Sequence, residues 1–89
     1  MYRVELKPRA QREFDRLPSG DQARVLAALV GLADEPRPRR SVKLTGSIYR
    51  LRVGPFRIIY AVFDRDQVVL VGKIARREKD TYDDIETLF

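Results

Sequence analysis

The first residues of the chain alternate between apolar and charged side chains and then change to a helical period. Apolar residues at positions 2, 4 and 6 predict a half-buried strand over residues 2–7. Pro8 suits the first turn of a helix. A short amphipathic helix is then indicated by apolar residues at i, i+4 and i+7, which are Ala10, Phe14 and Leu17.

A second helix is predicted from residue 19 to about residue 35. Ser19 and Gln22 have the spacing of a capping box, and Pro36 disfavours helix in the residue before it. The apolar arc is wide, so this helix is either well buried or covers part of its surface with a partner; the arc contains Val25, Leu26, Leu29, Val30, Leu32 and Ala33. The two helices, joined at Pro18-Ser19-Gly20, predict a helical hairpin.

The second half of the chain predicts a three-stranded meander. Residues 49–60 form two runs rich in aromatic and branched residues around Gly54-Pro55, which is a hairpin signal. This turn sets Val53 opposite Phe56, Arg52 opposite Arg57, Leu51 opposite Ile58 and Arg50 opposite Ile59. A strand can also start at Val42, and the turn cluster at 64–67 predicts another strand over 68–75. The expected fold is an α+β domain with an antiparallel-dominated sheet, which fills residues 1–89 and ends in a short helix over 78–89.

Three arginines share one face of the predicted hairpin at its turn end, because side chains alternate along a strand: Arg50, Arg52 and Arg57. Like charges directly across a strand pair are destabilising. The cluster is therefore either a solvated face or a site for phosphate oxygens, which suit guanidinium groups. Placing Phe63 opposite Val68 pairs Arg57 with Ile74, so we predict that Arg76 joins this face and Arg77 points away. A one-residue slip would reverse that prediction.

The amino-acid composition excludes several kinds of catalytic and metal-binding site. The 89 residues include no Cys and no His, which excludes disulfides, thiolate and imidazole metal sites, and catalysis by either residue. No Gly-rich phosphate loop and no converging carboxylates are found, and we expect no cofactor and no metal.

The sequence also predicts where the protein is found. No apolar run is long enough to span a membrane, and the N-terminus lacks the apolar core of a signal peptide, so we expect a cytoplasmic protein. The net charge of +5 favours an anionic partner such as nucleic acid. The basic loop at 36–40 is either a solvated connector or a flank that contacts a nucleic-acid backbone.

Phosphate chemistry by positioning and charge remains possible for this residue set. RNA carries its own nucleophile, the 2′-hydroxyl, and arginines can neutralise the charge that develops on the phosphate. Proton transfer would need Tyr82, Lys73, Lys79 or a crowded arginine. The ring of Tyr82 also offers a surface for base stacking.

The order of elements, the stretch Tyr49-Arg-Leu-Arg-Val-Gly-Pro-Phe-Arg-Ile-Ile-Tyr60, the later Lys73-Ile-Ala-Arg-Arg77 and Tyr82 together resemble the RelE/ParE superfamily of bacterial toxins. The resemblance covers nearly the whole chain. Known members of the RelE branch cleave messenger RNA in the ribosomal A site by 2′-hydroxyl attack, without a metal, and are neutralised by an antitoxin protein. The resemblance therefore implies an endoribonuclease whose partners are the ribosome, mRNA and a cognate antitoxin.

Carried over to this sequence, the resemblance implies a catalytic role for five residues. Arg50 and Arg52 would orient RNA and activate the nucleophile, Arg57 would stabilise the phosphate, Arg76 would act as general acid, and Tyr82 would stack on a base. Further RNA contacts are expected from nearby basic residues, which are Lys43, Lys73, Arg77 and Lys79. Two departures affect proton transfer: both early basic positions are arginine where relatives often have lysine, and Ala75 precedes Arg76 where many relatives have His.

Two other functions remain open at this point. A ParE-like toxin would inhibit DNA gyrase without cleaving RNA and would not need the converging arginines. A basic module would bind phosphate without catalysis. Either toxin implies an antitoxin, for which we expect an acidic or amphipathic segment that covers the basic face or the exposed apolar arc of the second helix.

Overall fold

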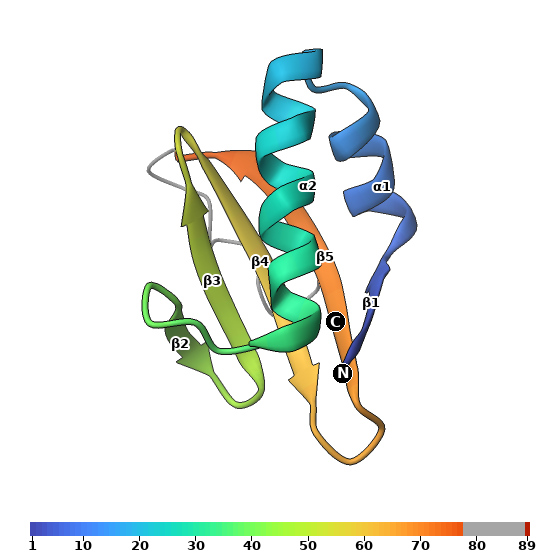
Figure 1. The fold of residues 1–89 in the computed structure, drawn as a ribbon, viewed down its shortest axis with the longest axis vertical. Coiled ribbons are helices and arrows are strands. Elements are labelled where there is room, and N and C mark those ends of the chain that lie inside the picture. Colours follow the sequence, from blue (N-terminus) through green and yellow to red (C-terminus); the bar gives the residue numbers. More distant parts are fainter. Residues whose placement is uncertain (78–88) are drawn as a thin grey trace.

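The computed structural model describes residues 1–77 and Phe89. These residues form seven elements in the order β1 (Arg3–Leu6), α1 (Pro8–Asp15), α2 (Ser19–Asp34), β2 (Val42–Thr45), β3 (Ile48–Val53), β4 (Phe56–Phe63) and β5 (Val68–Arg76). The strands form one sheet in the order β1-β5-β4-β3-β2, in which β1 and β5 are parallel and the other pairs antiparallel (Figure 1). The predicted α+β fold is confirmed. The helix predicted over 78–89 lies outside the described residues, apart from Phe89.

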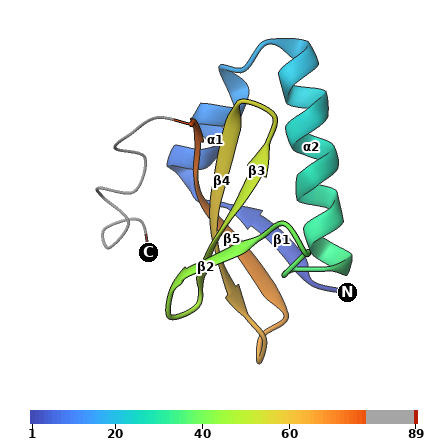
Figure 2. The same cartoon turned by 90° about the vertical axis from the view of Figure 1, so that its left-hand side faces the viewer.

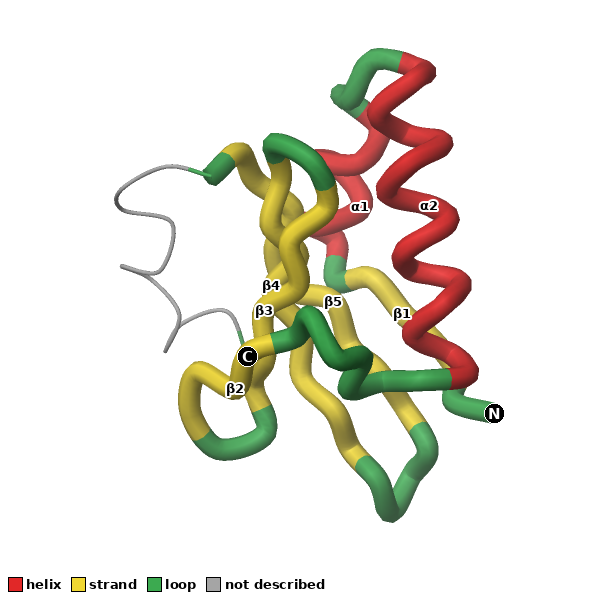
Figure 3. The backbone as a smooth tube through the Cα atoms, turned by 60° about the vertical axis from the view of Figure 1, so that its left-hand side comes forward, coloured by secondary structure: helices red, strands yellow, loops and turns green. Residues whose placement is uncertain are grey.

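α2 covers one face of the sheet (Figure 2), and α1 lies on the same side (Figure 3). The chain then crosses from the end of α2 to β2 at the far edge of the sheet. The core lies between the two layers. Its helical members are Ala10, Val25, Leu29 and Leu32, and its sheet members include Leu51, Phe56, Ile58, Tyr60, Val69, Val71 and Ile74. We call this side of the sheet the helix face and the opposite side the outer face.

The wide apolar arc of α2 is only partly buried. Val25, Leu29 and Leu32 are in the core, whereas Leu26 is 51% exposed and Val30 is 61% exposed. α2 therefore keeps an apolar strip on the surface, and the expectation that a partner covers this strip stays a prediction.

The predicted capping box at the start of α2 is wrong. No side chain caps this helix, whose N-cap residue is Pro18. Gln22 instead donates from Nε2 to the backbone oxygens of Phe14, at 3.1 Å, and Asp15, at 3.4 Å. It therefore satisfies carbonyl groups at the end of α1 that have no partner within that helix.

The open edge of β5 is completed by a helix side chain. The edge strand β1 accompanies β5 only as far as the pair Leu6–Val71, because Pro8 then turns the chain into α1. Further along, the backbone N–H of Ile74 donates to Oε1 of Glu13 at 2.9 Å. A carboxylate of α1 thus takes the place of a further strand at this point.

The pairing of β3 with β4 agrees with the prediction throughout: Val53 lies opposite Phe56, Arg52 opposite Arg57, Leu51 opposite Ile58 and Arg50 opposite Ile59. The turn between them contains Gly54, whose φ of +57° is in the left-handed region that favours glycine. We call this turn, Gly54-Pro55, the hairpin tip.

The predicted pairing of β4 with β5 is correct at one end and wrong at the other. Phe63 pairs with Val68, as expected, and Ala61 pairs with Leu70 in the same register. Gly72 then forms a β-bulge, so that Ile59 pairs with Lys73 and Arg57 with Ala75. An extra residue in one strand exchanges the faces of all the residues that follow it. The bulge therefore changes which basic residues of β5 share a face with Arg57.

Candidate functional site: a basic outer face at the hairpin tip

The outer face carries the arginines of the hairpin as predicted. Arg52 and Arg57 are direct cross-strand partners next to the tip, and Arg50 lies two residues further along β3. Arg52 is exposed, whereas Arg50 and Arg57 are half-buried. Because like charges across a strand pair repel, this arrangement would be stabilised by an anion.

The bulge adds Lys73 to this group. Lys73 pairs with Ile59, which lies on the outer face, and Lys73 is 9% exposed. Arg57 occupies the middle strand between Arg52 on β3 and the small Ala75 on β5. The structure therefore brings together three arginines and one lysine from three strands, which we call the basic face: Arg50, Arg52, Arg57 and Lys73.

The prediction that Arg76 joins Arg57 on one face is wrong. Arg76 pairs with Phe56, a residue of the helix face, and its Cζ lies 5.3 Å from the centre of the Phe56 ring. The following residue, Arg77, donates its backbone N–H to the oxygen of Pro55 at 2.9 Å. Both arginines are exposed beside the tip. The reason is the extra residue at Gly72, which moves Arg76 by one position relative to β4.

Three other predicted residues lie apart from the basic face or cannot be placed. Lys43 pairs with Tyr49, a helix-face residue, so the pairing assigns Lys43 to the side opposite Arg50. Lys79 and Tyr82 lie outside the described residues. Their expected contacts with RNA remain predictions.

One basic residue near the tip was missed by the sequence analysis. Arg24, on α2, lies against Gly54: a β-carbon at this glycine would be 3.2 Å from Cδ and 3.3 Å from Cζ of Arg24. The sequence signal was only a polar position on an amphipathic helix. The sequence does not predict this contact, because the angle at which α2 crosses the sheet decides which of its turns lies against the tip.

A polar network at the other end of the sheet fixes the loop between α2 and β2. Arg37 donates to Asp64 at 2.6 Å and to the hydroxyl of Tyr49 at 2.9 Å, and Tyr2 donates to the same carboxylate at 2.5 Å. The hydrogen bonds from Arg37, first, and Tyr2 lower the pKa of Asp64, while the bond to Asp64 raises the pKa of Tyr2. Arg37 therefore has a structural role, and all three arginines of the loop, Arg37, Arg39 and Arg40, are exposed.

Tyr60 extends this network into the core. Its ring stacks on Tyr49 with centroids 5.9 Å apart, and its hydroxyl donates to the backbone oxygen of Pro36 at 2.8 Å. Burial raises the pKa of Tyr60 to about 12. The start of the basic loop is thus held by a neutral, buried hydroxyl.

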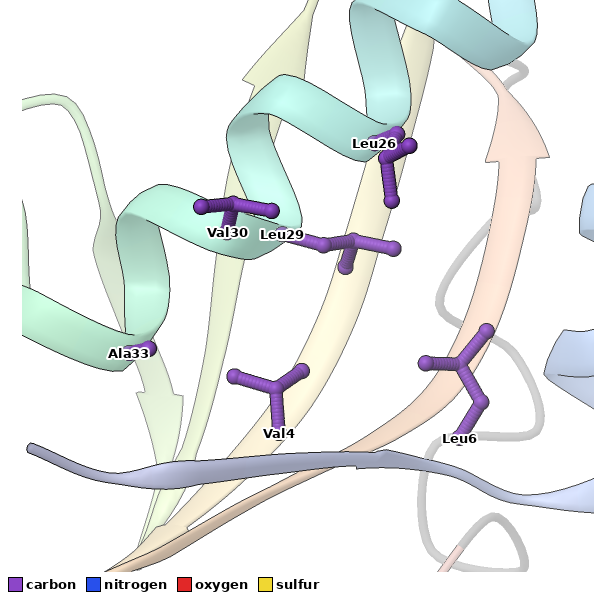
Figure 4. A pocket seen from close by; sticks show the side chains of 6 residues that line it. All are labelled: Val4, Leu6, Leu26, Leu29, Val30 and Ala33. Atoms are coloured by element: carbon purple, nitrogen blue, oxygen red, sulfur yellow. The ribbon is translucent and has the colours of Figure 1, made fainter.

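An apolar groove of about 290 Å³ runs between β1 and α2 (Figure 4). Val4 and Leu6 of β1 form one wall, and residues of α2 form the other, which are Leu26, Leu29, Val30 and Ala33. The groove thus includes the two large side chains that α2 leaves exposed. It lies on the helix side of the molecule and is separate from the basic face.

Across residues 1–77 and 89, no three acidic side chains come together as a metal-binding group. No helix in this part of the chain is long and apolar enough to cross a membrane.

Comparison with known proteins places this geometry in a family. A model described as the ParE toxin of the type II toxin-antitoxin system parDE matches residues 4–81. A Methanocaldococcus jannaschii protein assigned as toxin RelE1 is 30% identical over an alignment of 82 residues, and this alignment covers 86% of this chain and 91% of that protein. A chain of the archaeal RelE–RelB complex from Pyrococcus horikoshii OT3 is also 30% identical, with a TM-score of 0.77 and coverage of 88% of this chain and 97% of that one.

The fold also matches solved structures of lower sequence identity. A variant of E. coli toxin RelE in the free state has a TM-score of 0.82 at 22% identity, with 99% of this chain and 98% of that chain covered. The family model that matches residues 4–81 and the 30% identical relative show that the chain belongs to the RelE/ParE superfamily of toxins from type II toxin–antitoxin systems. Within it, the similarity to RelE proteins identifies a RelE-like toxin.

Proposed function

We propose that this chain is an endoribonuclease that cuts messenger RNA on the ribosome. The observation that carries the proposal is the convergence of Arg50, Arg52, Arg57 and Lys73 on one face of three adjacent strands. Cationic groups on rigid strands can hold a phosphodiester and stabilise the negative charge of its transition state. The similarity to RelE toxins supports the same activity.

Cleavage would proceed by attack within the RNA itself. The 2′-oxygen forms a bond to the adjacent phosphorus, the bond from phosphorus to the 5′-oxygen breaks, and the products are a 2′,3′-cyclic phosphate and a 5′-hydroxyl. Arg57, central on the face, holds the phosphate together with Arg52. Guanidinium groups stay protonated, so the 2′-hydroxyl proton passes to water. The Lys73 ammonium group gives a proton to the departing 5′-oxygen.

The proposal is tested by inducing the chain in a bacterial host and mapping message ends on ribosome-bound transcripts. We expect cuts within codons at the A-site position. Arg57→Ala should reduce the rate of cleavage by about 10²–10³, which is typical for loss of one group that stabilises transition-state charge. Arg65→Ala is the matched control, because Arg65 is an exposed arginine in the turn between β4 and β5, at the other end of β4 from the tip.

Single variants separate the remaining roles. Lys73→Arg retains the charge but provides a much weaker acid, so it should bind RNA and cut slowly, with a pH–rate profile that differs from the wild type. Arg76→Ala and Tyr82→Phe test the two roles implied by the family resemblance. Intact messages with blocked DNA supercoiling would instead establish a ParE-like gyrase inhibitor. Tight RNA binding without cleavage on translating ribosomes would leave a basic binding module.

We also propose that the apolar groove between β1 and α2 receives an amphipathic segment of a cognate antitoxin. Leu26 and Val30 are exposed there, although the rest of α2's apolar arc is largely buried. Exposed apolar surface of this kind is typical of a protein interface. The Pyrococcus horikoshii relative was solved as a RelE–RelB complex, which supports a protein partner for this chain.

The groove is tested by measuring the affinity of the toxin for its antitoxin. Val30→Glu should weaken binding at least tenfold, because burying a valine contributes about 1.5 kcal/mol or more and a buried charge opposes binding. Ala27→Glu is the control, since Ala27 is exposed on the same helix but does not line the groove. Equal affinities for these two variants would exclude the groove as the docking site.

A further inference from the structure

The hairpin tip is flanked by arginines on both faces of the sheet. Arg52 and Arg57 approach it on the outer face. Arg24 from α2 and Arg76 from the end of β5 approach it on the helix face. The tip lies beside α2 and the end of β5 (Figure 1), so residues distant in the sequence surround one short turn.

Arg24 occupies the space that a side chain at position 54 would fill. Gly54 has a φ of +57°, and a β-carbon there would meet Nη1, Cδ and Cζ of Arg24. The guanidinium group therefore rests directly on the backbone of the turn.

The charge of Arg24 is not neutralised within the described part of the protein. No ion pair or hydrogen bond joins Arg24 to any residue in 1–77 or 89. Asp21 lies three residues earlier on α2, where such pairing is possible, yet it forms no ion pair with Arg24. A guanidinium group that is exposed and has no carboxylate partner is available to bind an anion.

We propose that Arg24 is a phosphate-binding residue of the RNA site, and that the RNA backbone crosses the hairpin tip from the basic face to the helix side. The ligand is a phosphodiester of single-stranded RNA next to the one held on the basic face. This inference rests on the proposed RNA-directed function, but it concerns binding and requires no chemistry from Arg24. It extends the site onto an element that carries none of the residues predicted from the sequence.

The test measures the affinity of the purified chain for a short single-stranded RNA over a series of salt concentrations. Arg24→Gln should weaken binding about two- to fivefold, the range of an exposed ion pair. The slope of log K against log[salt] should fall in magnitude by about 0.7, the value for one phosphate contact with a single strand. Arg24→Lys should restore the slope, and Arg65→Gln, the control at the other end of β4, should leave affinity and slope unchanged.

The same variants are assayed for cleavage on translating ribosomes, which separates this inference from the proposed function. An Arg24-dependent salt slope without cleavage would uphold the phosphate contact and overturn the nuclease. Normal cleavage together with an unchanged slope in Arg24→Gln would overturn only the inference. It would also be overturned if the chain bound no RNA, or if Arg24→Gln weakened binding of the antitoxin alone.

Discussion

Glu13 is predicted to stabilise the basic face from the opposite layer of the protein. Its Oε1 atom accepts the backbone N–H of Ile74 at 2.9 Å, one residue after Lys73 and two after the bulge at Gly72. The side chain of Glu13 is 22% exposed. Because β1 has already left this edge of β5, Glu13→Ala would leave the Ile74 N–H without that acceptor.

The expected loss follows from the type of bond. A hydrogen bond to a charged group contributes about 1.5–3 kcal/mol, and alanine returns a few tenths through its higher helix propensity. We therefore expect Glu13→Ala to lower the free energy of unfolding by about 2 kcal/mol, or the melting temperature by about 8–16 °C for a domain of this size. Glu13→Gln retains an oxygen acceptor and should lose about half as much.

Urea denaturation and hydrogen exchange measure the two parts of this prediction. The Ile74 amide should exchange faster in Glu13→Ala, and RNA affinity should fall because the adjacent Lys73 is less well held. Asp15→Ala is the control, since Asp15 lies on the same helix and its side chain accepts an exposed bond from Gln11. If both variants unfold at the same urea concentration and protect Ile74 equally, Glu13 does not hold the strand and the reasoning is refuted.

Three other predictions concern the sheet ends. The pKa of Asp64 is lowered mainly by Arg37. The ionised carboxylate therefore stabilises the fold above its unfolded pKa of about 3.9, and this stability is lost as the pH falls further. Asp64→Asn should make the melting temperature less sensitive to acid. The pKa of Tyr60 is raised to about 12, so its contribution is complete below pH ~10 and is lost toward pH ~12. Tyr60→Phe should remove this alkaline loss and cost about 1–3 kcal/mol by leaving a buried carbonyl without its donor. Gly54→Ala should cost about 1–2 kcal/mol in urea denaturation, because its φ is +57°.

Each of these three predictions can be contradicted by its own measurement. An Asp64→Asn melting curve that changes with pH as steeply as the wild type would show that the ion pair does not stabilise the fold. Equal alkaline unfolding of Tyr60→Phe and wild type would exclude Tyr60 as the titrating group. A Gly54→Ala protein of undiminished stability would show that the turn can adopt another conformation.

The sequence by itself determined the elements and the β3–β4 hairpin. Alternation and helical spacing predicted the strand, the two helices and the meander in the observed order. Gly54-Pro55 determined the β3–β4 register, because a short turn leaves few ways to pair the flanking residues. The shared face of Arg50, Arg52 and Arg57 followed from that register and is confirmed by the pairing.

Only the tertiary structure decided which other basic residues lie near the three hairpin arginines. The bulge at Gly72 placed Lys73 on the basic face and Arg76 on the helix face. Two residues far away in the sequence contact β5 at this bulge. Glu13 accepts the Ile74 N–H, and the Cζ of Phe89 would be 2.6 Å from a β-carbon at Gly72. Arg24 reached the tip through the packing of α2 on the sheet. Local patterns fix how neighbouring residues alternate, whereas a one-residue slip and a helix crossing depend on contacts between residues far apart in the chain. The physical reason is that such contacts form only when the layers pack.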